Sequence, residues 1–118
     1  MRMSKYHNVK SAVDGIVFDS KREANRWCEL RLLERAGEIS DLQRQVRFEL
    51  APAVRIGASG RMKPSLRFYA DFTYTDLKHG GALVVEDVKS EPTAEKEAFR
   101  IKLHLMKSIH GIDVRLVT

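Results

Sequence analysis

At 118 residues and 13.5 kDa, with 43% hydrophobic residues, 7 Gly and 3 Pro, the chain suits one globular domain and excludes collagen-like and low-complexity proteins. No apolar run approaches the ~20 residues that cross a bilayer, and no apolar segment follows the basic N-terminus, which argues against a membrane partner and a secretory signal. The single cysteine, Cys28, agrees with a reducing cytoplasm, and the net charge of +5 suits either a polyanion such as nucleic acid or a solvated basic face.

The N-terminal part of the chain predicts one helix. Residues 1–14 are polar, and we expect them to be loosely ordered. After a short apolar run at residues 16–18, Ser20 is a favourable N-cap for a helix over about residues 21–36, which Gly37 ends.

The middle of the chain predicts three strands, over residues 45–50, 66–74 and 82–89, with a flexible turn at Gly57–Gly60. In the second strand the residues alternate cleanly. One face carries Leu66, Phe68, Ala70, Phe72 and Tyr74, and the other carries Arg67, Tyr69, Asp71, Thr73 and Thr75.

A second helix is predicted from Pro92 and Thr93 to about His110, where Gly111 ends it, and a last strand over residues 112–116. The order α-β-β-β-α-β predicts a single α/β domain over residues 1–118, with a central mixed β-sheet flanked by helices.

The positive charge is concentrated in two places. The stretch from Arg44 to Arg67 holds six basic residues against one acid, Glu49, and includes Arg61 and Lys63. On the second helix, a basic stripe contains Lys96, Arg100, His104 and Lys107. Lys102 falls instead on the apolar arc of that helix, where it would reach a phosphate near the acids or extend to the surface.

An acid two residues before a lysine occurs three times, and one of these patterns ends an apolar strand: Asp87-Val88-Lys89. Residues two apart on a strand point the same way, so Asp87 and Lys89 project together and Glu86 projects to the opposite face. If the two strands pair as a hairpin, Asp71 comes close to Asp87. Two carboxylates and an ammonium predict a Mg²⁺ site, and the alternative is a structural Asp–Lys ion pair.

Glu23 is a third acid with two open roles. Its helical position lies inside the apolar stripe, where a carboxylate is costly unless it is paired or binds a metal. It is also the third helical residue after Ser20, the position that completes a capping box. The four histidines lack metal spacing, and no phosphate-binding glycine loop is present.

These residues resemble the core of PD-(D/E)XK nucleases, with Ala70-Asp71 in place of the Pro-Asp motif. The ordered segments 18–24, Gln45, 69–72 and 85–89 resemble more closely a family of small phage and prophage proteins assigned to that superfamily. The resemblance spans about residues 5–117. It departs at Ser90, where family descriptions often show a glycine after the motif lysine.

The resemblance implies a Mg²⁺-dependent DNA endonuclease, with Mn²⁺ able to substitute, in the cytoplasm of the host cell. Asp71, Asp87, the carbonyl of Val88 and Glu23 would hold the metal, and Lys89 would orient or deprotonate the attacking water. Gln45 resembles a family position near the site. The implied DNA contacts, which would hold the backbone without reading sequence, are Arg44, Arg61, Lys63, Arg67, Lys96, Arg100 and Lys102.

Three functional hypotheses remain open from the sequence. The leading one is a structure-specific endonuclease for branched or nicked DNA in phage recombination or replication, such as a Holliday-junction resolvase. Whether it acts as a monomer or as a homodimer stays open. The second is a non-catalytic nucleic-acid-binding protein with structural acids. The third is a metal-dependent enzyme for a smaller phosphate ester, which an aromatic-lined pocket would favour.

Overall fold

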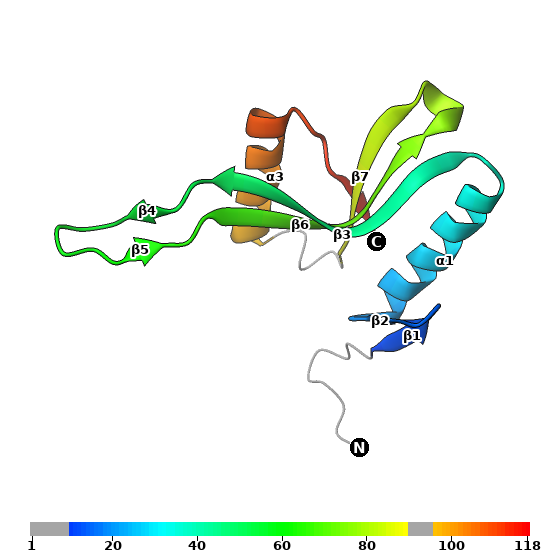
Figure 1. Cartoon of the computed structure of the whole chain (residues 1–118), viewed down its shortest axis with the longest axis horizontal. Helices are drawn as coiled ribbons and strands as arrows, with labels where there is room; N and C mark the ends of the chain where they lie inside the picture. Colours follow the sequence, from blue (N-terminus) through cyan, green and yellow to red (C-terminus); the bar gives the residue numbers. More distant parts are fainter. Residues whose placement is uncertain (1–9, 90–95) are drawn as a thin grey trace, which may run out of the picture.

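The computed structural model describes residues 10–89 and 96–118 as an α/β domain built on a four-stranded mixed sheet in the order β3-β6-β7-β8 (Figure 1). The β3, β6 and β7 strands are antiparallel neighbours, and β8 is parallel to β7. The predicted fold class is therefore confirmed. In the two described segments, no helix combines the length and the apolar character that a membrane crossing requires.

A small hairpin precedes the first helix. Strands β1 (Ser11–Val13) and β2 (Ile16–Phe18) pair antiparallel, so the expectation of loose order is wrong for residues 11–13, and residues 1–9 lie outside the described part. Helix α1 (Lys21–Arg35) follows as predicted, and the Ser20 hydroxyl caps it by accepting a hydrogen bond from the Glu23 N–H.

Strand β3 (Ile39–Ala51) is about twice as long as the predicted strand. The prediction missed its first half because polar and apolar residues do not alternate regularly there. A bulge at Asp41, whose φ is +55°, shifts the register between Ser40 and Gln43. One extra residue at a bulge breaks the period of two on which the sequence pattern depends.

The β3 strand continues past the sheet into a second hairpin that the sequence did not predict. Strands β4 (Val54–Arg55) and β5 (Met62–Lys63) pair on either side of the turn at residues 57–60, and the chain returns through β6 (Leu66–Asp76). We call residues 52–65 the arm. It forms one end of the longest dimension of the molecule (Figure 1).

After the short helix η1 (Leu77–His79), strand β7 (Ala82–Val88) ends one residue before Lys89. Helix α3 (Glu97–His110) ends at Gly111 as predicted, and its predicted start at Pro92 lies outside the described residues. The last strand, β8 (Arg115–Val117), is shorter than predicted, because Ile112 and Val114 pack on the α3 core instead of pairing with β7.

Two hydrophobic cores lie along the sheet, one under each helix. The α1 core contains Phe18, Ala24, Leu30, Ile39, Phe72, Tyr74 and Val84. The α3 core contains Leu50, Phe68, Ala70, Val85, Phe99 and Met106. The predicted apolar face of β6 is therefore divided: Phe68 and Ala70 pack with α3, whereas Phe72 and Tyr74 pack with α1. Asp71 lies at the point where the strand changes from one core to the other.

Candidate active site

The predicted acids of β6 and β7 meet where these two strands diverge. Phe72 is paired with Glu86, so Asp71 and Asp87 occupy the next opposite positions. The Asp71 Oδ2 atom accepts a hydrogen bond of 2.7 Å from the Val88 N–H, which fixes Asp71 against the end of β7. This antiparallel pairing is the condition on which the two-carboxylate hypothesis rested.

Asp87 is a buried carboxylate with unmet hydrogen-bonding capacity. It is 1% exposed, and neither of its oxygens makes a hydrogen bond among the described residues. The Lys89 Nζ lies 2.9 Å from Oδ2 as an ion-pair contact, which leaves Oδ1 without a partner. Burial, and then the Asp71 carboxylate, raise the pKa of Asp87 to about 6 against the opposing effect of Lys89. A buried oxygen of this kind is costly unless it has a ligand.

Glu23 joins this group from α1 through Gln45. The Gln45 Nε2 lies 3.1 Å from Glu23 Oε1 and 3.1 Å from Asp71 Oδ1, so one amide donates to both carboxylates. Glu23 is 6% exposed, as its place in the apolar stripe predicted. The Ser20 hydroxyl caps α1 as the capping-box reading requires, but the Glu23 carboxylate itself is directed to Gln45.

The backbone of Gln45 has an unusual conformation that gives its side chain this reach. Its φ is +53°, in the left-handed region that a non-glycine residue seldom adopts in a strand. It lies opposite Asp71, where β6 changes from one core to the other. Backbone strain of this kind costs about 1–3 kcal/mol and is concentrated at functional sites.

Burial raises the pKa of Glu23 to about 7, the neighbouring Asp71 and Asp19 act in the same direction, and Arg44 and Gln45 oppose them. A raised carboxyl pKa means that the folded state binds more protons than the unfolded state. The resulting stabilisation is complete below pH ~4.5 and is lost as the pH rises through about 7.

We therefore expect Glu23→Gln to increase the free energy of unfolding at pH 8 by on the order of 2 kcal/mol, and to change it little at pH 4.5. Thermal unfolding of both proteins across this pH range measures the difference. A gain that is equal at both pH values would contradict the raised pKa.

Lys89 is held as a cation beside the acids. Burial acts to lower the pKa of Lys89, but its contact with Asp87 and the nearby charges of Asp71 and Glu23 raise it overall. The Nζ also lies 5.5 Å from the centre of the Phe99 ring, which places the first turn of α3 next to the site.

Glu86 points to the opposite side of β7, as predicted, and makes a separate network. It is fully buried, and the Arg26 guanidinium donates two hydrogen bonds to it, Nε at 2.8 Å and Nη2 at 2.6 Å. The Tyr74 hydroxyl donates to Glu86 Oε2, and Arg115 Nη1 lies 3.8 Å from the same oxygen. Arg26 is one turn after Glu23 on α1, so this pair fixes α1 against the strand that carries Asp87.

The basic residues expected to contact DNA do not form one surface. Arg61 and Lys63 are exposed in the arm, and Arg67 is at the base of β6. Arg44 is half-buried, with its guanidinium 5.0 Å from the centre of the Phe18 ring, so the structure places it at the α1 side near Glu23.

The basic residues of α3 form a third group. Lys96, Arg100 and Lys102 are all exposed, so Lys102 extends to the surface, the second of its two predicted orientations. Lys107 of the same helix pairs with Asp113 at 2.7 Å.

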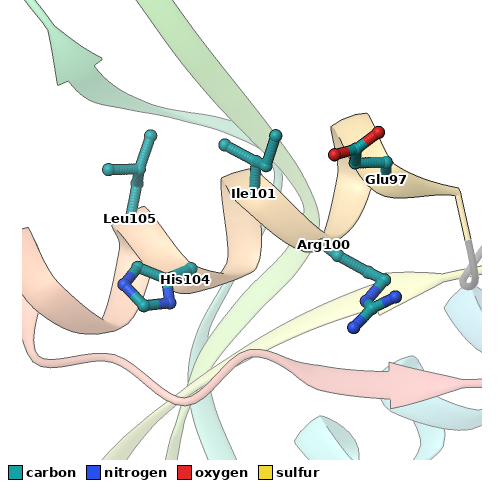
Figure 2. Close-up of a pocket in the computed structure, with 5 residues that line it drawn as sticks. All are labelled: Glu97, Arg100, Ile101, His104 and Leu105. Atoms are coloured by element: carbon teal, nitrogen blue, oxygen red, sulfur yellow. The ribbon is translucent and has the colours of Figure 1, made fainter.

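A hollow of about 550 Å³ lies on α3, lined by Glu97, Arg100, Ile101, His104 and Leu105 (Figure 2). None of the site carboxylates lines it, and it has no Phe, Tyr or Trp. This hollow therefore does not supply the aromatic pocket next to the acids that a small phosphate ester would need.

The site consists of two neighbouring carboxylates, Asp71 and Asp87, and a third acid, Glu23, which Gln45 separates from Asp71. Across residues 10–89 and 96–118, no three His, Cys, Asp or Glu side chains are already grouped as metal ligands. Asp71 and Asp87 alone match the one or two carboxylates through which Mg²⁺ is usually bound, with water filling its remaining positions. The Oδ1 of Asp87, which has no hydrogen-bond partner among the described residues, fits such a cation.

Comparison with known proteins identifies the family and no relative of established activity. No curated protein matches the chain, and no solved structure does. A family model matches residues 3–116, which is nearly the whole chain. The protein therefore belongs to the family described as "Protein of unknown function (DUF1064)".

Proposed function

We propose that this protein is a Mg²⁺-dependent DNA endonuclease with the catalytic chemistry of the PD-(D/E)XK superfamily. The observation that carries the proposal is Asp87, a carboxylate that is 1% exposed and lies beside Asp71 and Lys89, and whose Oδ1 has no partner within residues 10–89 and 96–118. A buried structural ion pair satisfies its oxygens with hydrogen bonds, as Glu86 does on the other face of the same strand. The contrast between these adjacent residues supports a ligand at Asp87.

Asp71 and Asp87 would hold the cation, together with the carbonyl of Val88, the residue after Asp87. Glu23 would join them when the Gln45 amide turns away from it; in the described arrangement that amide donates a hydrogen bond to Glu23 and to Asp71. When bound, Mg²⁺ supplies positive charge at the scissile phosphate and makes the attacking water more acidic.

Lys89 would act as a cation and not as the general base. Its raised pKa keeps the Nζ protonated at neutral pH, so it suits orienting the water and stabilising the negative charge that develops on the phosphate. The exposed Arg100 of α3 and Lys96 just before it would hold the adjoining phosphates, since Phe99 of the same helix contacts Lys89.

The test is incubation of the protein with linear, nicked, flapped and four-way DNA substrates. We expect cleavage with Mg²⁺ or Mn²⁺, little with Ca²⁺ and none in chelator, because the ligand set is all oxygen. Preference for nicked or four-way DNA would support the proposed role in phage recombination or replication. Cleavage that persists undiminished in chelator would contradict the metal mechanism, and tight binding without cleavage of any substrate would favour the non-catalytic binder.

A further inference from the structure

The arm is an exposed two-stranded ribbon that the hydrophobic cores do not explain. None of its residues belongs to either core, and Val54, Ile56 and Met62 are 46%, 63% and 56% exposed. The arm lies at one end of the longest dimension of the molecule, 56 Å (Figure 1). Because the arm adds nothing to either core and leaves these apolar side chains exposed, it is a candidate binding element.

The turn at the tip of the arm is tightly built. Gly60 donates its N–H to the Gly57 carbonyl at 3.1 Å, and Arg55 Nη1 donates to the Gly60 carbonyl at 3.2 Å. A Cβ on Gly60 would lie 2.0 Å from the Ile56 carbonyl oxygen, so only glycine fits there. The tip is therefore a defined hairpin.

The positive charge of the arm favours a polyanion as its binding partner. Residues 52–65 contain Arg55, Arg61 and Lys63 and no acid, so two arms would repel each other. Val54 is paired with Lys63 and Arg55 with Met62, so each face of the ribbon carries one cation and one apolar side chain. A ribbon inside a nucleic-acid groove has a phosphate wall on both sides and base edges at its tip.

An open surface leads from the carboxylates to the arm. On β3 and β6, Arg47 is paired with Tyr69 and Glu49 with Arg67, alternating with the residues that pack on α3. These side chains face away from α3; Arg47, Glu49 and Tyr69 are exposed, the last by 48%. We call this surface, which begins at Gln45 and Asp71, the open row.

The length of the open row matches DNA. Ile56 at the tip is eleven positions after Gln45, and at ~3.3 Å per extended residue the two are at most about 36 Å apart. One turn of B-form DNA measures about 34–36 Å. Its major groove, about 12 Å wide and 8.5 Å deep, admits a two-stranded β-ribbon.

We propose that duplex DNA lies along the open row and that the arm enters its major groove about one helical turn from the phosphate at the carboxylates. The arm then supplies affinity and a fixed distance, and the carboxylates supply the chemistry. The inference depends on the proposed function for the role of the carboxylates, but the DNA-binding role of the arm can be tested without any cleavage.

The first experiment measures DNA affinity and its salt dependence by fluorescence anisotropy, in Ca²⁺ or chelator, for wild type and Arg61→Ala/Lys63→Ala. Each lost phosphate contact lowers the salt slope by ~0.9, so we expect a slope lower by about 2 and an affinity about 10- to 60-fold weaker. The matched control, Arg35→Ala/Lys78→Ala, removes the same charge at the α1 and η1 end of the molecule (Figure 1) and should retain wild-type binding. Equal losses in both variants, or none in either, would overturn the role of the arm.

The second experiment shortens the duplex on each side of the mapped cleavage position. We expect affinity to fall when one flank drops below about 10 base pairs, a threshold that Arg61→Ala/Lys63→Ala should abolish. Methyl green, which fills the major groove, should compete with the protein, and the minor-groove ligand netropsin should not. Absence of a flank threshold, or competition by netropsin alone, would overturn the proposal. DNA that is bound through the arm and never cut would instead refute the proposed nuclease.

Discussion

Asp87→Asn is expected to reduce metal-dependent DNA cleavage by about 10³-fold or more while leaving DNA affinity unchanged or tighter. The substitution keeps the shape of the side chain and removes the charge that holds a divalent cation where negative charge develops in the transition state. Single-turnover cleavage in Mg²⁺ and anisotropy in chelator measure the two quantities separately.

The same substitution should also stabilise the fold at pH 8. Burial raises the pKa of Asp87 to about 6, so its stabilising contribution is present below pH ~4 and is lost as the pH rises through about 6. Asparagine avoids this cost, and the lost attraction to Lys89 offsets part of the gain, leaving on the order of 1 kcal/mol. The matched control is Asp113→Asn, which removes an exposed aspartate paired with Lys107 and should change neither cleavage nor stability. A destabilised Asp87→Asn that still cuts at the wild-type rate would identify Asp87 as a structural ion-pair partner.

Arg26→Ala is expected to cause a large loss of stability, about 3 kcal/mol, seen as a fall in Tm of roughly 10–20 °C. The Glu86 carboxylate is fully buried and would keep the Tyr74 hydroxyl and Arg115 as partners, while losing the two hydrogen bonds from Arg26. Removing the main ion-pair partner of a buried carboxylate costs far more than the ~0–1 kcal/mol that a surface ion pair contributes.

Arg31→Ala is the control on the same helix. Arg31 pairs with Glu34 at 2.6 Å, lies 3.9 Å from Asp14 and is 5.7 Å from the centre of the Trp27 ring, all near the surface, so its loss should cost about 1 kcal/mol. Chemical denaturation of the two variants gives the comparison. Similar small losses in both would show that the Arg26–Glu86 pair contributes no more than a surface ion pair.

The sequence predicted the elements whose signals are local. Ser20 and Gly37 bracket α1, and the alternation of β6 and the apolar run of β7 place both strands. Pairing these strands was sufficient to bring Asp71 beside Asp87, and helical periodicity was sufficient to bury Glu23. Each of these inferences depends only on residues a few positions apart or on the pairing of two strands in one hairpin.

The features that the sequence did not predict depend on long-range geometry. The bulge at Asp41 hides the first half of β3, and the left-handed Gln45 opposite Asp71 accompanies the division of β6 between two cores. The Arg26–Glu86 pair joins residues that are 60 positions apart, so no local sequence pattern predicts this contact. The sequence predicts only a flexible turn for the arm, because β4 and β5 have two residues each and are too short to show an alternating pattern.

The most direct test of a divalent cation at Asp71 and Asp87 is calorimetric titration of Mn²⁺ into the free protein, for wild type and Asp87→Asn in parallel. The buried Oδ1 of Asp87, which no described residue partners, predicts saturable binding by wild type, competition by Mg²⁺, and loss of that binding in Asp87→Asn. Equal Mn²⁺ binding by both proteins, or none by wild type with or without DNA, would contradict the metal site.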